Sequence, residues 1–304
     1  RLTVGRSKLQ EYAAVFDEIE RRFGVSRGVL TAFWAFETDF GGYQGDFNTL
    51  NSLMTLSHDC RRPGIFQPQV LAAIDLYKRG DFSPTGTTGA WAGEIGMVQM
   101  LPADIRDSGL DGDGDGHVDL KKSAPDALLS GANMLSKLGW RPNEPWLHEV
   151  SLPQGFDYSK SGSHQKFSTR DWVEMGVQPR QGPLFDTDKA SIIVPNGHGG
   201  PAFIAYPNFD VYFEWNQSFT YVLTAAYFAN RLEGAEVFNA GNPGAPLDQG
   251  SMKQLQRKLQ ALGHDVGDVD GILGYNTRIA VQKEQARLGL VPDAWPTWDL
   301  LNRL

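Results

Sequence analysis

Hydrophobic residues recur every three or four positions over several long stretches of this chain. Between residues 8 and 23 the recurring positions are Leu9, Tyr12, Ala13, Phe16, Ile19 and Phe23. Such spacing places the side chains on one face, so it predicts an amphipathic α-helix. The same criterion predicts further helices at 26–37, 68–78, 125–138 and 219–232, with Ser26 as the N-cap of the helix that ends at Glu37. The pattern is typical of a mainly α-helical protein.

Two regions interrupt the helical pattern. Residues 148–213 contain many prolines and glycines and short apolar runs such as residues 191–194, which predict a small strand-rich insertion. Residues 235–247 are rich in turn-forming residues and are expected to be a linker. After it, residues 248–304 show three short helical patterns and are expected to fold as a separate three-helix unit. The predicted domains are therefore 1–234, which includes the insertion, and 248–304.

One helical stretch ends on a carboxylate shortly before two glycines. Leu30, Phe33 and Trp34 precede Glu37 by seven, four and three positions, which places all of them on the same helix face. If this face is buried, Glu37 projects from an apolar wall, and poor solvation raises the pKa of its carboxyl group. A glutamic acid that stays protonated near neutral pH is the proton donor that glycosidic bond cleavage requires. The alternative is a Glu37 that reaches water or pairs with an arginine.

An acidic, glycine-rich segment lies in the middle of the chain. Its carboxylates at loop positions one, three, five and nine are Asp111, Asp113, Asp115 and Asp119, and glycine stands at position six. Alternating oxygen ligands around a tight turn suit Ca²⁺. Position twelve, where a bidentate Glu is expected, is Lys122; Asp126 is expected to complete the ligand set, with His117 at position seven. A single such loop predicts a structural calcium clip; the alternative is a solvated acidic turn.

Composition narrows the function classes. The 304 residues carry a formal net charge of −8, which argues against a nucleic-acid-binding protein, because such proteins present basic surfaces. No apolar run approaches the roughly 20 residues that span a bilayer. The single Cys60 excludes an internal disulfide. Because the chain begins at Arg1 and not at Met, a trimmed mature form is expected, in which a removed signal or lipid-anchor segment would not be visible.

Several motifs, in order and spacing, resemble the B-type lytic murein transglycosylases. Over residues 1–234 they are Glu37-Thr38 followed by glycine, Arg61-Arg62-Pro63, the segment GAWAGEIGMVQMLP at 89–102, the acidic loop with Asp126-Ala127, and Trp215-Asn216. The C-terminal residues 248–304 resemble a three-helix peptidoglycan-binding module. The positions that carry this second resemblance are Leu255-Gln256, Leu262-Gly263, Asp270-Gly271, Gly274 and Thr277.

The resemblance implies a lysozyme-like helical catalytic domain with the small strand-containing insertion, followed by the three-helix module. It implies an enzyme, a carbon–oxygen lyase that cleaves the β-1,4 bond between N-acetylmuramic acid and N-acetylglucosamine without water and leaves 1,6-anhydro ends. Glu37 falls on the family's catalytic glutamate, Gln99 and Asn216 fall on substrate-contacting positions, and the loop aspartates with Asp126 fall on its calcium site. Peptidoglycan glycan strands, and other cell-wall enzymes, are then the expected partners. No organic cofactor is expected, and the expected location is the periplasm.

Three positions depart from the family pattern. Ala90 stands where Ser is frequent, Trp215 stands where Tyr is frequent, and Trp295 replaces an expected glycine of the small module. Trp215 keeps the capacity to stack on a sugar, so it stays among the expected substrate contacts, although the phenol hydrogen bond is lost. None of these departures affects Glu37.

The sequence offers one strong carboxyl candidate and no convincing pair. A hydrolase normally needs a second carboxylate, and Asp39 and Glu94 are the nearest alternatives; Glu94 lies in a glycine-rich loop from which it could reach the cleft. If Glu37 acts alone, first as acid and then as base, the substrate's N-acetyl group must supply the nucleophile. Arg61 and Arg62 could pair with Glu37, bind stem-peptide carboxylates or form surface ion pairs. The competing functions are a muramidase that uses water and a non-catalytic wall-binding scaffold.

Overall fold

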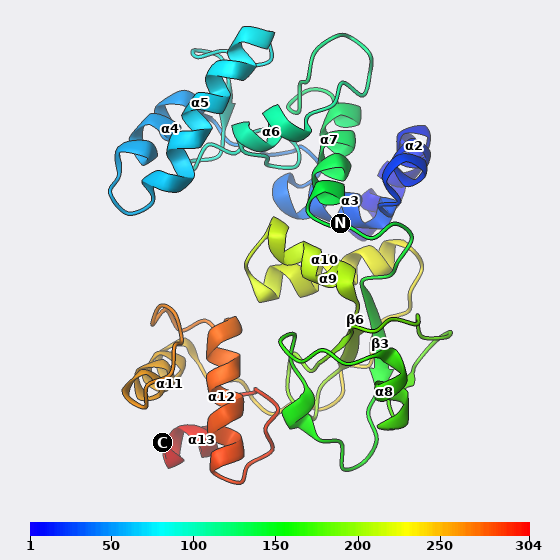
Figure 1. Ribbon diagram of the computed structural model, residues 1–304, viewed down its shortest axis with the longest axis vertical. Helices are drawn as coiled ribbons and strands as arrows, with labels where there is room; N and C mark the ends of the chain where they lie inside the picture. Colours follow the sequence, from blue (N-terminus) through cyan, green and yellow to red (C-terminus); the bar gives the residue numbers. More distant parts are fainter. The chain divides into compact units, whose positions relative to one another are not determined.

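The computed structural model describes residues 1–304, which form two compact units. The first unit contains Arg1–Asn143 and Ala225–Ala235, and the second contains Glu144–Thr224 and Glu236–Leu304. Thirteen α-helices and six short strands make up most of the regular structure (Figure 1). The prediction of a mainly α-helical fold with a small strand-containing segment is therefore confirmed. None of the helices combines the length and the apolar character needed to cross a bilayer.

The first unit is almost entirely helical. Its helices are α1 (Leu2–Glu11), α2 (Ala13–Phe23), α3 (Arg27–Thr38), α4 (Thr49–His58), α5 (Pro63–Arg79), α6 (Pro102–Ser108), α7 (Ala124–Lys137) and the end of α10 (Phe219–Leu232). Strands β1 (Phe47–Asn48) and β2 (Thr88–Gly89) form a small antiparallel pair. The helix predicted over 8–23 is divided at Tyr12, whose ring lies edge-on to Trp34 at 5.5 Å between centroids. This contact joins residues far apart in the chain, so periodicity did not reveal the break.

Helix α3 forms the centre of the first unit. All residues from 28 to 35 are buried, so both faces of the helix are covered and not only the predicted one. A helix that is apolar on all sides is stable only in the protein interior. Its first turn is capped as predicted, because the Ser26 hydroxyl accepts a hydrogen bond from the Gly28 N–H at 3.0 Å.

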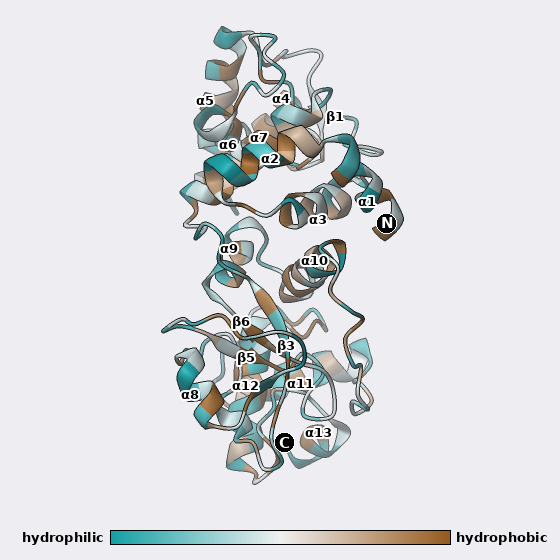
Figure 2. Ribbon diagram, turned by 90° about the vertical axis from the view of Figure 1, so that its right-hand side faces the viewer, coloured by the Kyte–Doolittle hydropathy of each residue, from teal (hydrophilic) through white to brown (hydrophobic).

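The second unit is built around a four-stranded antiparallel sheet with the order β4-β3-β6-β5. The strands are β3 (Leu147–Ser151), β4 (Gln178–Pro179), β5 (Ser191–Ile193) and β6 (Ala202–Ala205). Every residue of β5 and β6 is buried, and Figure 2 shows hydrophobic colours in this part of the sheet. Helix α8 (Thr169–Glu174) covers the sheet through Trp172, whose indole N–H donates to the Ala190 carbonyl oxygen at 3.0 Å. A 3₁₀ turn (Tyr158–Lys160) and α9 (Pro207–Trp215) complete this part.

The C-terminal helices enclose a small core of their own within the second unit. They are α11 (Gln249–Ala261), α12 (Tyr275–Arg287) and α13 (Trp298–Arg303), and the core between them contains Leu255, Leu259, Val281, Leu300 and Leu301. The segment expected to be a linker is held by hydrogen bonds, since the Asn239 N–H donates to Glu149 Oε1 at 2.8 Å and the Asn242 N–H donates to the Gly199 carbonyl oxygen at 2.7 Å. The predicted domain boundaries at 234 and 248 stay a prediction.

Candidate active site

Glu37 lies on the last turn of α3. The apolar residues that precede it on the same face, Leu30, Phe33 and Trp34, are buried, and Glu37 itself is half-buried. The chain leaves the helix through Asp39, which adopts a left-handed conformation with φ 52°. Glu37 therefore stands at the end of a buried apolar helix, as the sequence suggested. The raised pKa of its carboxyl group stays a prediction.

Thr38 joins the end of α3 to the glycine-rich segment 89–102. Its side chain is 3% exposed, and its hydroxyl donates to the Met97 carbonyl oxygen at 2.7 Å and accepts from the Gly41 N–H at 2.9 Å. Both partners lie outside the helix. The residue after Glu37 is thus tied to the segment that carries Gln99.

The glycine-rich segment is shaped by close packing. A Cβ atom on Gly93 would lie 2.3 Å from the Leu53 side chain, and one on Gly96 would lie 2.5 Å from Leu120, so larger residues would displace the segment. Gln99 has a positive φ of 53°, and its amide nitrogen donates to the Gly96 carbonyl oxygen at 2.8 Å. This contact leaves the Gln99 side-chain oxygen available as an acceptor.

The two alternative carboxylates have different surroundings. Asp39 is exposed, and its Oδ1 lies 3.1 Å from Arg1 Nε, so it forms a surface ion pair. Glu94 is half-buried, and its Oε2 is buried without a hydrogen-bond partner. Of the two, Glu94 is the one whose environment would favour a chemical role.

Arg61 and Arg62 lie in the turn before α5. Arg61 forms a surface ion pair with Asp59, with Arg61 Nη2 2.5 Å from Asp59 Oδ2, and this guanidinium lowers the pKa of the Asp59 carboxyl group to about 2. Arg62 is the exposed N-cap residue of α5 and makes no side-chain capping bond. The predicted surface ion pair is present for Arg61. Substrate binding by Arg61 and Arg62 stays a prediction.

Trp215 and Asn216 belong to the second unit. Trp215 is the last residue of α9, and Asn216 caps the helix with an extended backbone. The Asn216 side-chain oxygen accepts a hydrogen bond from the Ser218 N–H at 2.9 Å, which orients its amide group. Their predicted role in substrate binding stays a prediction.

Two exposed aromatic residues of the first unit lie outside the set of expected substrate contacts. Trp91 is 66% exposed and Tyr43 is 70% exposed, although such large apolar rings are usually buried. The Tyr43 N–H donates to the Thr38 carbonyl oxygen at 3.0 Å, so this ring follows directly on the end of α3. The one available signal was the position of Trp91 in the glycine-rich segment. Both rings are suited to stack on sugars.

The acidic loop gathers three of its carboxylates. Oxygens of Asp111, Asp113 and Asp115 all lie within 4.8 Å of one another. The turn is held by the Gly114 and Gly116 N–H groups, which donate to the two Asp111 oxygens at 2.6 Å and 2.8 Å. The Gly116 bond is the main cause that lowers the pKa of Asp111. Three carboxylates on a glycine-supported turn suit a hard cation.

The other two predicted ligands have protein partners. The buried Asp126 accepts hydrogen bonds from the N–H groups of Gly112 and Asp119, each at 2.8 Å, and also from the Ser123 hydroxyl. Burial raises the pKa of Asp126 despite these bonds. The His117 ring nitrogen Nδ1 lies 3.2 Å from Asp81. Asp126 therefore closes the loop by binding its backbone, and His117 pairs outside the carboxylate cluster.

Comparison with known protein families gives two matches. Residues 1–230 match the Transglycosylase SLT domain, and residues 248–304 match a peptidoglycan binding domain. Among curated proteins, the Membrane-bound lytic murein transglycosylase B of Escherichia coli (strain K12) is 26% identical over 220 residues, which are 70% of this chain. The matched part spans 58% of the length of that relative.

Solved structures are similar over a larger share of the chain. SltB3 from Pseudomonas aeruginosa, in complex with NAG-anhNAM-pentapeptide, is 37% identical with a TM-score of 0.89, over 100% of this chain and 82% of that one. The Escherichia coli lytic transglycosylase Slt35 in complex with calcium is 24% identical with a TM-score of 0.65, over 76% of this chain and 74% of that one. The second likeness supports the fold alone.

Proposed function

This chain belongs to the Transglycosylase SLT domain family, and from that premise we propose that it is a lytic transglycosylase of peptidoglycan. It cleaves the β-1,4 bond between N-acetylmuramic acid and N-acetylglucosamine without adding water. The observation that carries this proposal is the position of Glu37 at the end of a buried apolar helix. The 37% identity to SltB3, which was solved with an anhydro-muramyl ligand, supports the same reaction.

In the proposed mechanism Glu37 acts twice. Its carboxyl proton passes to the glycosidic oxygen as the bond to the anomeric carbon breaks, and the N-acetyl carbonyl oxygen of the muramyl sugar bonds to that carbon. The C6 hydroxyl oxygen then bonds to the anomeric carbon and displaces the acetyl oxygen. Glu37, now a carboxylate, takes the proton of this hydroxyl group. No water is consumed, and the glutamic acid is regenerated.

The surrounding residues position the reacting groups. Thr38 holds the end of α3 on the segment that carries Gln99, and the Gln99 amide is itself oriented by Gly96. We assign Gln99 and Asn216 to the substrate's acetamide or hydroxyl groups, and Trp215 to stacking on a sugar. Positioning of this kind lowers the entropy cost of the reaction.

The decisive test is the product formed from purified wall. Wild-type protein is expected to release fragments with 1,6-anhydro ends, which mass spectrometry separates from reducing ends by the mass of one water. Glu37→Gln is expected to lower the rate by about a hundredfold to ten-thousandfold, while the matched control Asp39→Asn keeps it. Reducing ends would show a muramidase, and undiminished cleavage by Glu37→Gln would refute the assignment of Glu37.

Glu94→Gln separates the two enzyme readings. The unpartnered Oε2 of Glu94 is the one observation that favours a hydrolase with a second carboxylate. A loss of activity in Glu94→Gln together with reducing ends in the wild-type product would support the muramidase. Full activity of this variant is expected if Glu37 acts alone.

The acidic loop is proposed to bind Ca²⁺ as a structural clip. The clustered oxygens of Asp111, Asp113 and Asp115 support this assignment, and no reaction step involves the ion. Lys122 at position twelve supplies an ammonium group where a carboxylate would complete the site; its Nζ lies 3.1 Å from Asp119 Oδ2. We therefore expect weak binding. Because peptidoglycan lies outside the cytoplasm, the protein is proposed to act there, in the periplasm.

A further inference from the structure

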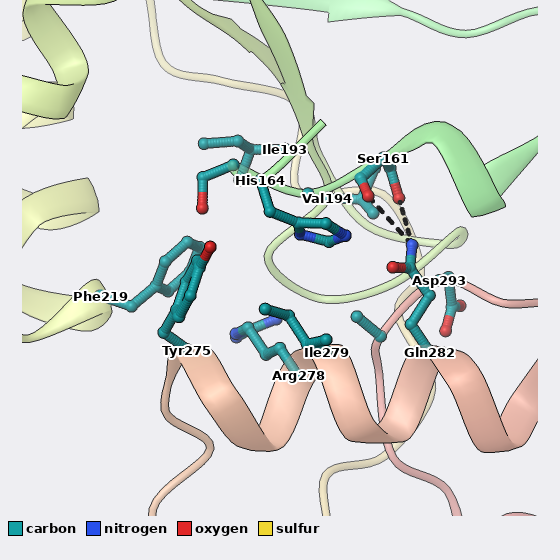
Figure 3. Close-up of a pocket in the computed structure, with 13 residues that line it drawn as sticks. Ser161, His164, Ile193, Val194, Phe219, Tyr275, Arg278, Ile279, Gln282 and Asp293 are labelled. Atoms are coloured by element: carbon teal, nitrogen blue, oxygen red, sulfur yellow. Dashed lines mark hydrogen bonds between the residues drawn. The ribbon is translucent and has the colours of Figure 1, made fainter. Parts of the chain in front are cut away.

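The small cavity drawn in Figure 3 lies where α12 contacts the strand-containing part of the second unit. Its Gln282 is 6% exposed, and the amide nitrogen donates to the carbonyl oxygens of Tyr158 and Ser161 at 2.9 Å and 3.0 Å. This donor is therefore used by the protein itself. A larger cavity, of about 500 Å³, lies in the first unit and contains a buried carboxylate whose second oxygen has no donor.

The larger cavity is bounded by the end of α5 with the residues that follow it, by α6, and by the second half of the acidic loop. Ligand sites commonly have volumes of about 300–1,000 Å³ and largely apolar walls. Five of the lining side chains are apolar and at most 6% exposed: Leu76, Phe82, Ile95, Ile105 and Leu120. The cavity is therefore suited to a short aliphatic chain.

Asp81 is the buried charged residue of this cavity. Its side chain is 7% exposed. The carboxylate oxygen Oδ1 accepts from the Val118 N–H at 3.2 Å and lies 3.2 Å from His117 Nδ1. No protein group donates to the other oxygen, Oδ2. A buried charged oxygen without a donor is costly, so a ligand that donates to Asp81 Oδ2 gains free energy on binding.

Two ammonium groups border the cavity, and both have other partners. Lys121 Nζ donates to the Thr88 carbonyl oxygen at 2.6 Å and to the Thr88 hydroxyl oxygen at 2.7 Å. Lys122 Nζ lies 3.1 Å from Asp119 Oδ2. Neither lysine forms an ion pair with Asp81, so the buried carboxylate is left for a cation from outside the chain.

His117 supplies a second acceptor at the rim of the cavity. Its side chain is 55% exposed, and its Nδ1 faces the Asp81 carboxylate. Because a carboxylate oxygen only accepts, a neutral His117 carries its proton on Nδ1 in this contact. The other ring nitrogen, Nε2, is then an acceptor. Asp81 Oδ2 and His117 Nε2 thus both require a donor.

The shape of the site selects one kind of cation. A guanidinium group binds a carboxylate best through both oxygens, but Asp81 Oδ1 already has protein partners. Asp81 also belongs to no group of three metal-ligating side chains, since the group near this cavity is Asp111, Asp113 and Asp115. An ammonium group is a compact charge with three donors, so it can bind the single free oxygen and a second acceptor.

We propose that this cavity binds a primary ammonium group on a short aliphatic chain, with Asp81 Oδ2 and His117 Nε2 as its acceptors. Such a group occurs on free diamines and on lysine-like side chains of peptides. The apolar lining also supports the segment that carries Gln99, because the Ile95 N–H donates to the Met100 carbonyl oxygen at 2.8 Å and the Leu120 carbonyl oxygen accepts from Met97 at 2.9 Å. The site takes no part in the proposed reaction.

Two variants separate this site from the carboxylate cluster of the acidic loop. Asp81→Asn removes the charge but keeps an acceptor for the Val118 N–H, so the fold should be retained. The matched control is Asp113→Asn, which removes a carboxylate from the cluster but does not line the cavity. The Val118 N–H reports on Asp81, and the Gly114 and Gly116 N–H groups report on Asp111.

Binding is measured by NMR on the ¹⁵N-labelled full chain. The probes are cadaverine, a blocked tripeptide with a central lysine, and 1-pentanol as the uncharged control. We expect at least one amine to shift the Val118 resonance in a saturable manner and 1-pentanol not to do so. Asp81→Asn should weaken amine binding by about tenfold or more, because a hydrogen bond to a charged group is lost. Asp113→Asn should leave amine binding unchanged.

The two amines identify the source of the ligand. Binding of cadaverine alone supports a free diamine, and binding of the tripeptide supports an amine carried by a peptide. If neither amine shifts Val118, if 1-pentanol binds equally well, or if Asp81→Asn binds as the parent does, the proposal is wrong. A shift of Val118 by Zn²⁺ and not by amines would show a metal site instead. If Asp81→Asn does not fold, the comparison of cadaverine with 1-pentanol on the parent protein decides the question.

Discussion

Thr38 is the residue that connects the proposed acid to its surroundings. Its buried hydroxyl bonds Met97 and Gly41, both outside α3, so the last helical turn and the glycine-rich segment are coupled by one side chain. A shift of the helix end would move Glu37 relative to Gln99. Small displacements of this kind lower catalytic rates strongly, because the reacting atoms must meet at a fixed distance.

Thr38→Val tests this coupling. The variant keeps the shape of the side chain but leaves the Met97 carbonyl oxygen without its donor, so we expect the free energy of unfolding to fall by about 1–3 kcal/mol. Wall digestion should slow as well. Urea unfolding and a wall-release assay measure the two effects. Thr38→Ser, which retains the hydroxyl, serves as control, and equal behaviour of the Val and Ser variants would contradict the proposed role.

An ion pair connects α2 to α3. Arg27, the first residue of α3, contacts Glu20 of α2 through Nε at 2.9 Å and Nη2 at 2.6 Å. The hydrogen bond from Arg27 lowers the pKa of the Glu20 carboxyl group below its usual value of 4.5. The folded state therefore binds this proton less readily than the unfolded state does. The resulting stabilisation is present above pH 4.5 and is lost as the pH falls through the lowered pKa.

Glu20→Gln is expected to lower the free energy of unfolding at pH 7 by less than about 1 kcal/mol, because the pair is partly screened by solvent. The difference from wild type should disappear well below pH 4.5. Urea unfolding at several pH values measures this dependence. Glu18→Gln, which removes an exposed pair with Arg22 on the same helix, should show a smaller effect. A difference that persists in acid would contradict the assignment.

The acidic loop makes a prediction about metal binding. Ca²⁺ is expected to raise Tm slightly, since it binds the folded loop and not the unfolded chain. Lys122→Glu removes the ammonium group and supplies the missing carboxylate at position twelve, so the rise in Tm at the same Ca²⁺ concentration should become larger. Lys78→Glu on α5 controls for the change in net charge. If Ca²⁺ shifts neither protein, the loop is a solvated acidic turn.

At the scale of the whole chain, the contacts of Trp295 explain one departure from the family pattern, the tryptophan that replaces an expected glycine. Its indole N–H donates to the Gly244 carbonyl oxygen at 3.0 Å, in the segment expected to be a linker. A Cβ atom on Gly197 would lie 2.6 Å from Trp295 Cβ, so this residue packs tightly on the strand-containing part. Trp295 therefore contacts both the segment 235–247 and the strand-containing part of the second unit.

Trp295→Ala should loosen the segment 235–247. We expect limited proteolysis to cut this segment several times faster than in wild type, because cleavage requires the backbone to leave its contacts. Trp298→Ala, which changes an exposed ring of the same module, should not alter the rate. Equal rates in all three proteins would show that Trp295 does not hold the segment.

Sequence spacing predicted correctly those features that depend only on residues close together in the chain. The Ser26 cap and the apolar face before Glu37 were read from spacing, and each depends on residues within two turns of one another. Helix α4 was not predicted, and the break at Tyr12 was missed, because it coincides with packing on Trp34, 22 residues away in the chain. The sequence also did not indicate that Trp91 is exposed, because large aromatic side chains are usually buried.

The sequence by itself determined the helical class, the family, the acidic turn and the identity of the proposed acid, because each is encoded in residue types at short spacing. The tertiary structure alone decided that Asp126 bonds the loop backbone and that Arg61 pairs with Asp59. It alone decided that Gln282 of the C-terminal module donates to the Ser161 carbonyl oxygen of the strand-containing part. Each of these polar groups has many possible partners along the chain, and only the folded structure determines which of them lie together.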